Sequence, residues 1–266
     1  MREEGFPSPM SPEGLPPPLR DAVSHLVDAC RRAFGPHLRC VIVKGSAIKG
    51  DFMPGYSDLD LHAFVDPETL MSDRTPKLEY ALRFQEAIGP LDPRVAGASQ
   101  FQVYFLRADR TADDWTPSVP GSYEIVYGDL PRALREWKTF DFKGQAKRNL
   151  ARIPDDRRLL IERTLDKPNR VLATYVRFAG TVLKGHAYSA ALLASEDAPG
   201  VLRMRTAELV QDLAKHSPTL ASVERFFAHV ANWPRVEQEA DYARDAFRLA
   251  IEALEAIERW VASRTG

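Results

Sequence analysis

The sequence has few cysteines, no long apolar run and no excess of charge of either sign. Its two cysteines, Cys30 and Cys40, form no CxxC pair and have no histidine at a zinc-ligand spacing, so neither a disulfide framework nor a zinc finger is expected. No run of about 18 apolar residues occurs, and the first residues lack the apolar segment of a signal peptide. These absences argue against a membrane span and favour a reduced, cytoplasmic protein.

Charge is balanced as well, with 36 Lys and Arg against 37 Asp and Glu and a formal net charge of −1 at pH 7. Proteins that hold nucleic acid through its phosphate backbone usually carry a strong basic field, which this composition does not provide. A nucleic acid is therefore not the expected partner.

The length of 266 residues suits two domains, each with its own core. Residues 1–18 contain FPSPMSPEGLPPP, which is too rich in proline for a helix or strand, so a flexible arm is predicted there. Strand and helix patterns alternate over residues 19–130, and only helical patterns follow over 131–266. The chain is predicted to be α+β, with a mixed sheet and flanking helices followed by an all-α helical bundle domain.

Local patterns predict the individual elements. Apolar residues recur at helical spacing in PLRDAVSHLVDACRRAFG, which Gly35-Pro36 ends, and a second helix is expected at 74–89. Four runs predict strands, namely RCVIVKG, SDLDLHAFVD, SQFQVYFLRAD and GSYEIVYGD. In the second half the patterns predict helices at 131–138, 155–166, 168–186, 201–216, 219–233 and 235–263.

Two aspartates stand one residue apart in the predicted strand SDLDLHAFVD. Asp58 and Asp60 occupy positions i and i+2, so both carboxylates should leave the same face of the strand. Two like charges side by side repel each other and resist burial unless a cation lies between them. Mg²⁺ suits such a pair, because it prefers carboxylate oxygens and keeps water and substrate phosphate as its remaining ligands.

A candidate cradle for that phosphate lies just upstream. Gly45 and Ser46 follow a predicted strand and open a short helix, where backbone N–H groups and the positive end of the helix dipole can meet an anion. Gly45 permits a close approach of the backbone, and the hydroxyl of Ser46 can donate to phosphate. Lys49 adds a positive charge one turn along the chain.

The stretch GSAIKGDFMPGYSDLDL resembles the signature of the nucleotidyltransferase superfamily that includes DNA polymerase β, in which G-S-x-A-R-G is followed by S-D-x-D-L. Lys49 takes the arginine position and Ile48 the position of a small residue. The positions that match the signature are Gly45, Ser46, Gly50, Ser57, Asp58, Asp60 and Leu61. The helical second half is similar in layout to that of antibiotic-modifying adenylyltransferases.

The resemblance implies a role for each matching residue. It assigns the nucleotide to Gly45, Ser46, Lys49 and Ser57, and it assigns catalytic metal ions to Asp58 and Asp60. It also implies a third carboxylate on the next long strand, which would help to bind metal and activate the attacking hydroxyl.

Gln102 stands at that third position, in SQFQVYFL. An amide oxygen can coordinate a metal ion, but it carries no charge and takes no proton at neutral pH. Gln102 is thus the expected third metal ligand, and the catalytic base must come from elsewhere. Glu124 is the first candidate, with Asp109 after the strand and Glu162 in the helical half as alternatives.

The function implied is Mg²⁺-dependent transfer of a nucleoside monophosphate from an NTP, with ATP expected, to a small hydroxylated acceptor. The balanced charge favours a small molecule over a nucleic acid, and a protein acceptor is left open. The alternative is a nucleotide-binding sensor or partner module that has lost turnover. Gln102 favours this alternative, and the Gly-Ser and Asp-x-Asp motifs oppose it.

Four other residues carry weaker expectations. We expect His62 to point to the opposite face from the aspartates, as a core or edge histidine. Lys184 and His186 are expected to end an apolar helix, where basic residues suit the negative end of the dipole. Trp115 is expected either to stack on a base or sugar or to act as a packing anchor.

Overall fold

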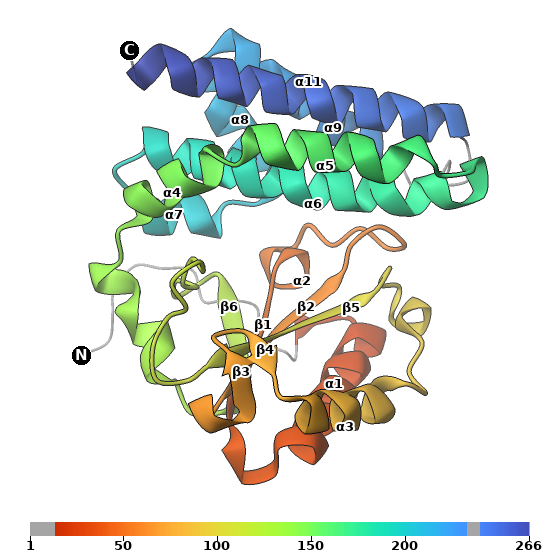
Figure 1. Ribbon diagram of the computed structural model, residues 1–266, viewed down its shortest axis with the longest axis vertical. Coiled ribbons are helices and arrows are strands. Elements are labelled where there is room, and N and C mark those ends of the chain that lie inside the picture. The colour runs from red at the N-terminus through yellow and green to blue at the C-terminus, as the bar shows by residue number, and fades with distance from the viewer. Residues whose placement is uncertain (1–13, 233–239, 266) are drawn as a thin grey trace. The chain divides into compact units, whose positions relative to one another are not determined.

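The computed structural model describes residues 14–232 and 240–265 (Figure 1). The chain divides into two units, Met1–Phe140 and Asp141–Gly266, so residues 131–140 group with the first unit. Residues 1–13 of the predicted arm lie outside the described part. Of its remaining residues, Leu15 is buried, and Pro17 opens the first helix instead of continuing an arm.

A four-stranded mixed sheet forms the centre of the first unit, in the order β5-β2-β1-β6. Strand β1 runs antiparallel to both β2 and β6, whereas β2 and β5 run parallel. The strands are β1 (Leu38–Lys44), β2 (Leu59–Val65), β5 (Phe101–Arg107) and β6 (Tyr123–Gly128), and each falls on one of the four predicted runs. A second sheet pairs two short strands, β3 (Leu70–Ser72) and β4 (Thr75–Pro76).

Helices α1 (Pro17–Phe34) and α3 (Leu78–Ile88) pack against each other and against one face of the sheet (Figure 1). Their core takes alternate residues of the central strands, such as Val41, Val43 and Leu61. Parallel strands need a crossover connection, and α3 lies in the one between β2 and β5. The helix expected at 74–89 begins only at Leu78, because the residues before it pair in β4.

The other face of the sheet carries a smaller apolar cluster that includes Ile42, Phe64 and Leu106. The segment expected to be an α-helix at 131–138 is a 3₁₀ helix, η5 (Arg132–Thr139), and its residues Ala133 and Leu134 pack into this cluster. The remaining short elements of the first unit are α2 (Ser46–Lys49), η2 (Gly35–His37), η3 (Pro67–Thr69) and η4 (Pro93–Ala96).

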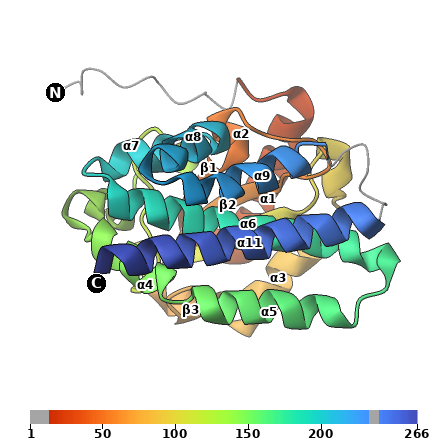
Figure 2. The same ribbon diagram turned by 90° about the horizontal axis from the view of Figure 1, so that it is seen from above.

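The second unit is helical throughout its described residues. Helices α6 (Asn169–Ala194) and α11 (Ala240–Thr265) each span 26 residues and lie side by side (Figure 2). The others are α4 (Phe142–Leu150), α5 (Ile153–Leu165), α7 (Ala198–Arg203), α8 (Thr206–His216), α9 (Ala221–Val230) and the short η6 (Pro218–Leu220). None of the helices described in either unit has the length and apolar character that crossing a membrane would require.

Two helix predictions for this unit need correction. The helix expected at 201–216 is interrupted, because the backbone N–H of Arg205 is capped by Glu208 at the start of α8. Helix α6 continues to Ala194, so Lys184 and His186 lie inside it and do not meet its C-terminal dipole. The part of the last predicted helix at 235–239 lies outside the described residues.

Candidate functional site

Asp58 and Asp60 lie at the start of β2, a central strand of the mixed sheet, where β1 ends and β5 begins. Asp60 pairs across the strands with Lys44 of β1 and with Gln102 of β5. Directly paired residues project from the same face of a sheet, so these three side chains are neighbours. Asp58 precedes β2 by one residue, and its carboxylate also reaches the Gln102 amide. The two carboxylates therefore converge, as their spacing predicted.

The Gln102 amide joins the two carboxylates. The end of the amide that faces them lies 3.3 Å from Asp58 Oδ2 and 3.0 Å from Asp60 Oδ1, and the other end meets the hydroxyl of Tyr104. With its nitrogen toward the carboxylates, the amide donates to both and accepts from Tyr104. With its oxygen toward them, three oxygens face one another, an arrangement that only a shared cation makes favourable.

Two residues that the sequence did not suggest hold Asp58 in place. The Ser99 hydroxyl donates to Asp58 Oδ1 at 2.5 Å, and the Gln100 amide donates to Oδ2 at 2.9 Å. Both precede β5, and because β2 and β5 are parallel, their starting ends meet at the same edge. Ser99 and Gln100 stand in the run SQFQ, but only the pairing of β2 with β5 shows that they approach Asp58.

Gly45 lies against the carboxylate of Asp60. Its backbone angles, φ 73° and ψ −151°, fall in a region that only glycine adopts readily, and a Cβ placed there would overlap Asp60 Oδ2. The backbone just after β1 thus lies directly against the Asp60 carboxylate. Only a residue without a side chain permits this approach.

The predicted phosphate-binding residues have different surroundings. Ser46 is buried and opens α2, which is a single turn of four residues, so the dipole that α2 offers an anion is small. Lys49 ends this turn and is partly exposed. Ser57 has a structural task, because its hydroxyl accepts from the Met53 N–H at 2.9 Å and so closes the turn that delivers Asp58.

The predicted base does not join this cluster. Glu124 pairs with Val43, whereas Lys44 pairs with Tyr123, so Glu124 leaves the sheet on the face opposite to Asp60. Burial raises the pKa of Glu124. In the described register, Asp60 of β2 projects from the other face of the sheet and does not face Glu124. Alternation within β6 can be predicted from the sequence, but the register that decides which face each residue takes cannot.

Of the two alternative bases, Asp109 belongs to the same unit as Asp60 but lies at the other end of the strands. Asp109 follows β5 at its far end and accepts two hydrogen bonds from Arg107, at 2.6 and 2.7 Å, which lower its pKa. Glu162 lies on α5 in the second unit, with an exposed side chain.

Lys44 is a site residue that the sequence analysis did not consider. Its ammonium group donates to the Ser118 hydroxyl at 3.2 Å and faces the same side of the sheet as Asp60. Although part of the side chain stays accessible, protein atoms surround the ammonium, and this burial lowers its pKa while the charge of Asp60 raises it. A lysine at the end of the apolar run VIVK was the only available signal.

His62 is on the same face as Asp60, not the opposite one, because the two residues are separated by two positions in β2. Its ring is 2% exposed and lies 5.5 Å from the ring of Tyr104 and 5.2 Å from that of Trp115. Burial, together with the charge of Lys44, holds its pKa well below the ordinary value, so the ring is neutral at pH 7.

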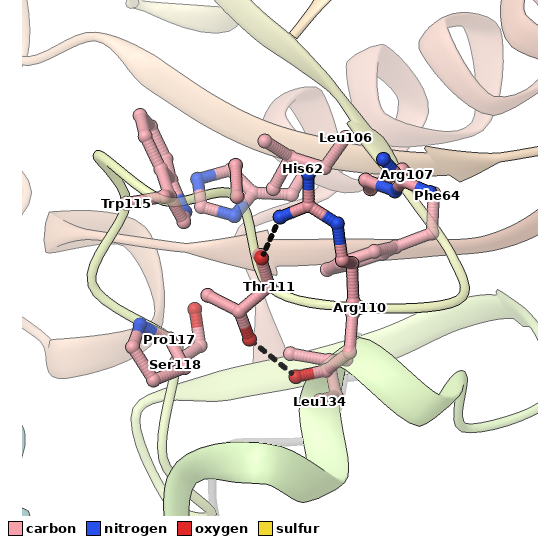
Figure 3. Close-up of a pocket in the computed structure, with 12 residues that line it drawn as sticks. His62, Phe64, Leu106, Arg107, Arg110, Thr111, Trp115, Pro117, Ser118 and Leu134 are labelled. Atoms are coloured by element: carbon pink, nitrogen blue, oxygen red, sulfur yellow. Dashed lines mark hydrogen bonds between the residues drawn. The ribbon is translucent and has the colours of Figure 1, made fainter. Parts of the chain in front are cut away.

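A cavity of about 10 Å³ adjoins this histidine (Figure 3). Its wall includes Trp115, Ser118 and Thr111, and it has room for about one water molecule rather than a nucleobase. His62 Nδ1 has no hydrogen-bond partner in the described chain. Trp115 packs on His62 and Tyr104, so it is a packing anchor here.

A second group of potential ligands lies at the opposite end of β1 and β2. His37, Asp66 and Glu68 offer ligand atoms within 4.8 Å of one another, so they could hold a metal ion. Arg39 already donates to both oxygens of Asp66 at 2.5 Å and lowers its pKa, so a cation would have to compete with the guanidinium. Nothing in this group selects Mg²⁺.

Comparison with known proteins adds no family to this picture. No family model matches the chain, and no curated protein matches it either. The first unit, with its mixed sheet and flanking helices, is compatible with a nucleotidyltransferase-like fold. The conclusion at this level is an α+β unit with an acidic site at one sheet edge, followed by a helical unit.

Proposed function

We propose that this protein is an Mg²⁺-dependent nucleotidyltransferase that moves a nucleoside monophosphate from an NTP, with ATP expected, to a small hydroxylated acceptor. The observation that carries the proposal is the convergence of Asp58, Asp60 and the Gln102 amide beside the bare backbone of Gly45. Sequence motif and geometry agree at this one place.

The donor atoms fit Mg²⁺. Asp58 and Asp60 would bind it through carboxylate oxygens, and Gln102 would bind it through the amide oxygen that can face both. Ser99 and Gln100 orient Asp58 for this task. When bound, Mg²⁺ supplies positive charge against the phosphate oxygens and the departing pyrophosphate.

The chain's own groups would receive the triphosphate. The first N–H groups of the helical turn that follows Gly45 have no acceptor within the turn and would donate to an anion. The Ser46 hydroxyl and the Lys49 ammonium would add a donor and a positive charge. Binding here would place the α-phosphorus near the aspartates, where the acceptor oxygen attacks and pyrophosphate leaves.

A second candidate function is a nucleotide-binding module without turnover. Two observations favour it, because the position next to Asp60 carries a neutral amide and Glu124 points to the other face. Under the transferase proposal, the acceptor proton is taken by solvent or by a group outside the first unit. Under the module proposal, no proton is removed.

The two functions differ in pyrophosphate release. The protein would be incubated with ATP, Mg²⁺ and a panel of hydroxylated acceptors, with Asp60→Asn as the test variant and Asp113→Asn, at a 90% exposed side chain, as the matched control. Release that Asp60→Asn abolishes and Asp113→Asn preserves supports the transferase. Mg²⁺-dependent ATP binding without release supports the module, and absence of binding contradicts both.

A further inference from the structure

The neighbours of Asp60 make the site less negative than a pair of aspartates suggests. On one side, the register places Lys44 beside Asp60, and on the other side it places Gln102. The flanking positions thus hold a cation and a neutral amide. Two carboxylates and one ammonium leave a single net negative charge.

The position of the Lys44 ammonium is fixed. Ser118, which accepts from its Nζ at 3.2 Å, is 4% exposed and lies in the segment that covers this face. An enclosed ammonium needs a counter-charge, and Asp60 is the carboxylate paired with it across the strands. Tyr123, which pairs with Lys44 across the strands, and His62 and Tyr104 on the same face add no charge in their neutral forms.

Gln102 can act in the place of a cation. With its NH₂ group toward the carboxylates, it donates to Asp58 and Asp60 while the Tyr104 hydroxyl donates to its oxygen. Turning the amide over would present the oxygen to a metal ion, and the hydroxyl would then accept from the NH₂ group. One amide therefore serves the site with and without a single ion.

We propose that Lys44 and Gln102 limit this site to one divalent cation in the absence of nucleotide. The inference rests on the proposed function, because it concerns the same metal site. A second divalent ion would have to share two carboxylates with the first, beside an enclosed ammonium and without a third carboxylate. Two divalent cations that share the same carboxylates lie close together and repel each other.

Titration with Mn²⁺ alone, followed by the paramagnetic resonance signal of the free ion, counts the bound cations. The wild-type protein is expected to bind one Mn²⁺. Gln102→Glu is expected to bind two, because it supplies the missing charge. Lys44→Met is expected to bind one Mn²⁺ more tightly, on the order of tenfold or more. Lys77→Met, at an exposed lysine of the same unit, is expected to match the wild type.

Several outcomes would overturn the inference. These are two ions bound by the wild type, one ion bound by Gln102→Glu with unchanged affinity, or unchanged affinity in Lys44→Met. A wild type that binds no Mn²⁺ would instead refute the proposed function. Should Lys44→Met fail to fold by circular dichroism, the count for Gln102→Glu still decides the matter.

Discussion

Replacing Gly45 with alanine should damage both the stability of the fold and the metal site. The backbone at this position, with φ 73° and ψ −151°, costs a residue with a side chain on the order of 1–3 kcal/mol. The added Cβ would also overlap the carboxylate of Asp60, so either the turn or the aspartate must move. The cost therefore exceeds that of the backbone conformation alone.

Gly97→Ala is the matched control. Gly97 also has a positive φ, 71°, in the left-handed region, where a side chain costs roughly 1–2 kcal/mol. A Cβ at Gly97 would meet only Pro54, at an ordinary 3.8 Å. Both variants carry the penalty of a positive φ, so the difference between them reports the overlap with Asp60 together with the less favourable ψ of Gly45.

Urea unfolding and metal titration together measure this difference. Gly45→Ala should lower the free energy of unfolding by about 1 kcal/mol more than Gly97→Ala does. It should also weaken Mn²⁺ binding, since a ligand misplaced by about 1 Å can cost on the order of a hundredfold in function. Equal losses of stability and unchanged metal binding in both variants would refute the close approach of Gly45 to Asp60.

Four further results are expected. Ser46→Ala should weaken ATP binding by about 1.5–3 kcal/mol in calorimetry, because it removes one donor to a charged group and leaves the backbone donors, and unchanged affinity would count against the cradle. Asp60→Asn should abolish pyrophosphate release and lower the free energy of unfolding by about 1 kcal/mol, because Lys44 loses its counter-charge; an unchanged or raised stability would contradict that pairing. Glu124→Gln should leave turnover unchanged, because Glu124 lies on the other face, and loss of turnover would show that the face assignment is wrong. Burial holds the pKa of His186 below its unfolded value of 6.5, although Asp156 at 2.9 Å opposes the shift. The free energy of unfolding should therefore fall as the pH drops below 6.5. His186→Gln should lessen this fall, and exposed His25→Gln should not.

Local features of the site can be predicted from the sequence alone. The alternation within SDLDLHAFVD placed both carboxylates on one face. Gly45 was expected to let the backbone approach a phosphate, whereas in the structure the group that lies against it is the carboxylate of Asp60. These features depend on periodicity and backbone sterics, which a short stretch of sequence contains.

The same alternation also contained the position of His62, which was assigned to the wrong face although it follows Asp60 by two residues. The alternation of side chains along the strand would have been enough to correct this assignment. The helix through Lys184 and His186 is a different case. No helix-breaking residue follows directly after His186. Helix α6, which packs against α11 and α8, continues to Ala194.

Long-range strand pairing determines which residues complete the site. Pairing of β1 with β6 includes a register irregularity at Val41–Ile42, and that register turns Glu124 away from Asp60. The parallel pairing of β2 with β5 brings Ser99 to Asp58, and the antiparallel pairing with β1 brings Lys44 to Asp60. Each contact joins residues far apart in the chain, and strand register depends on long-range packing that no local pattern specifies.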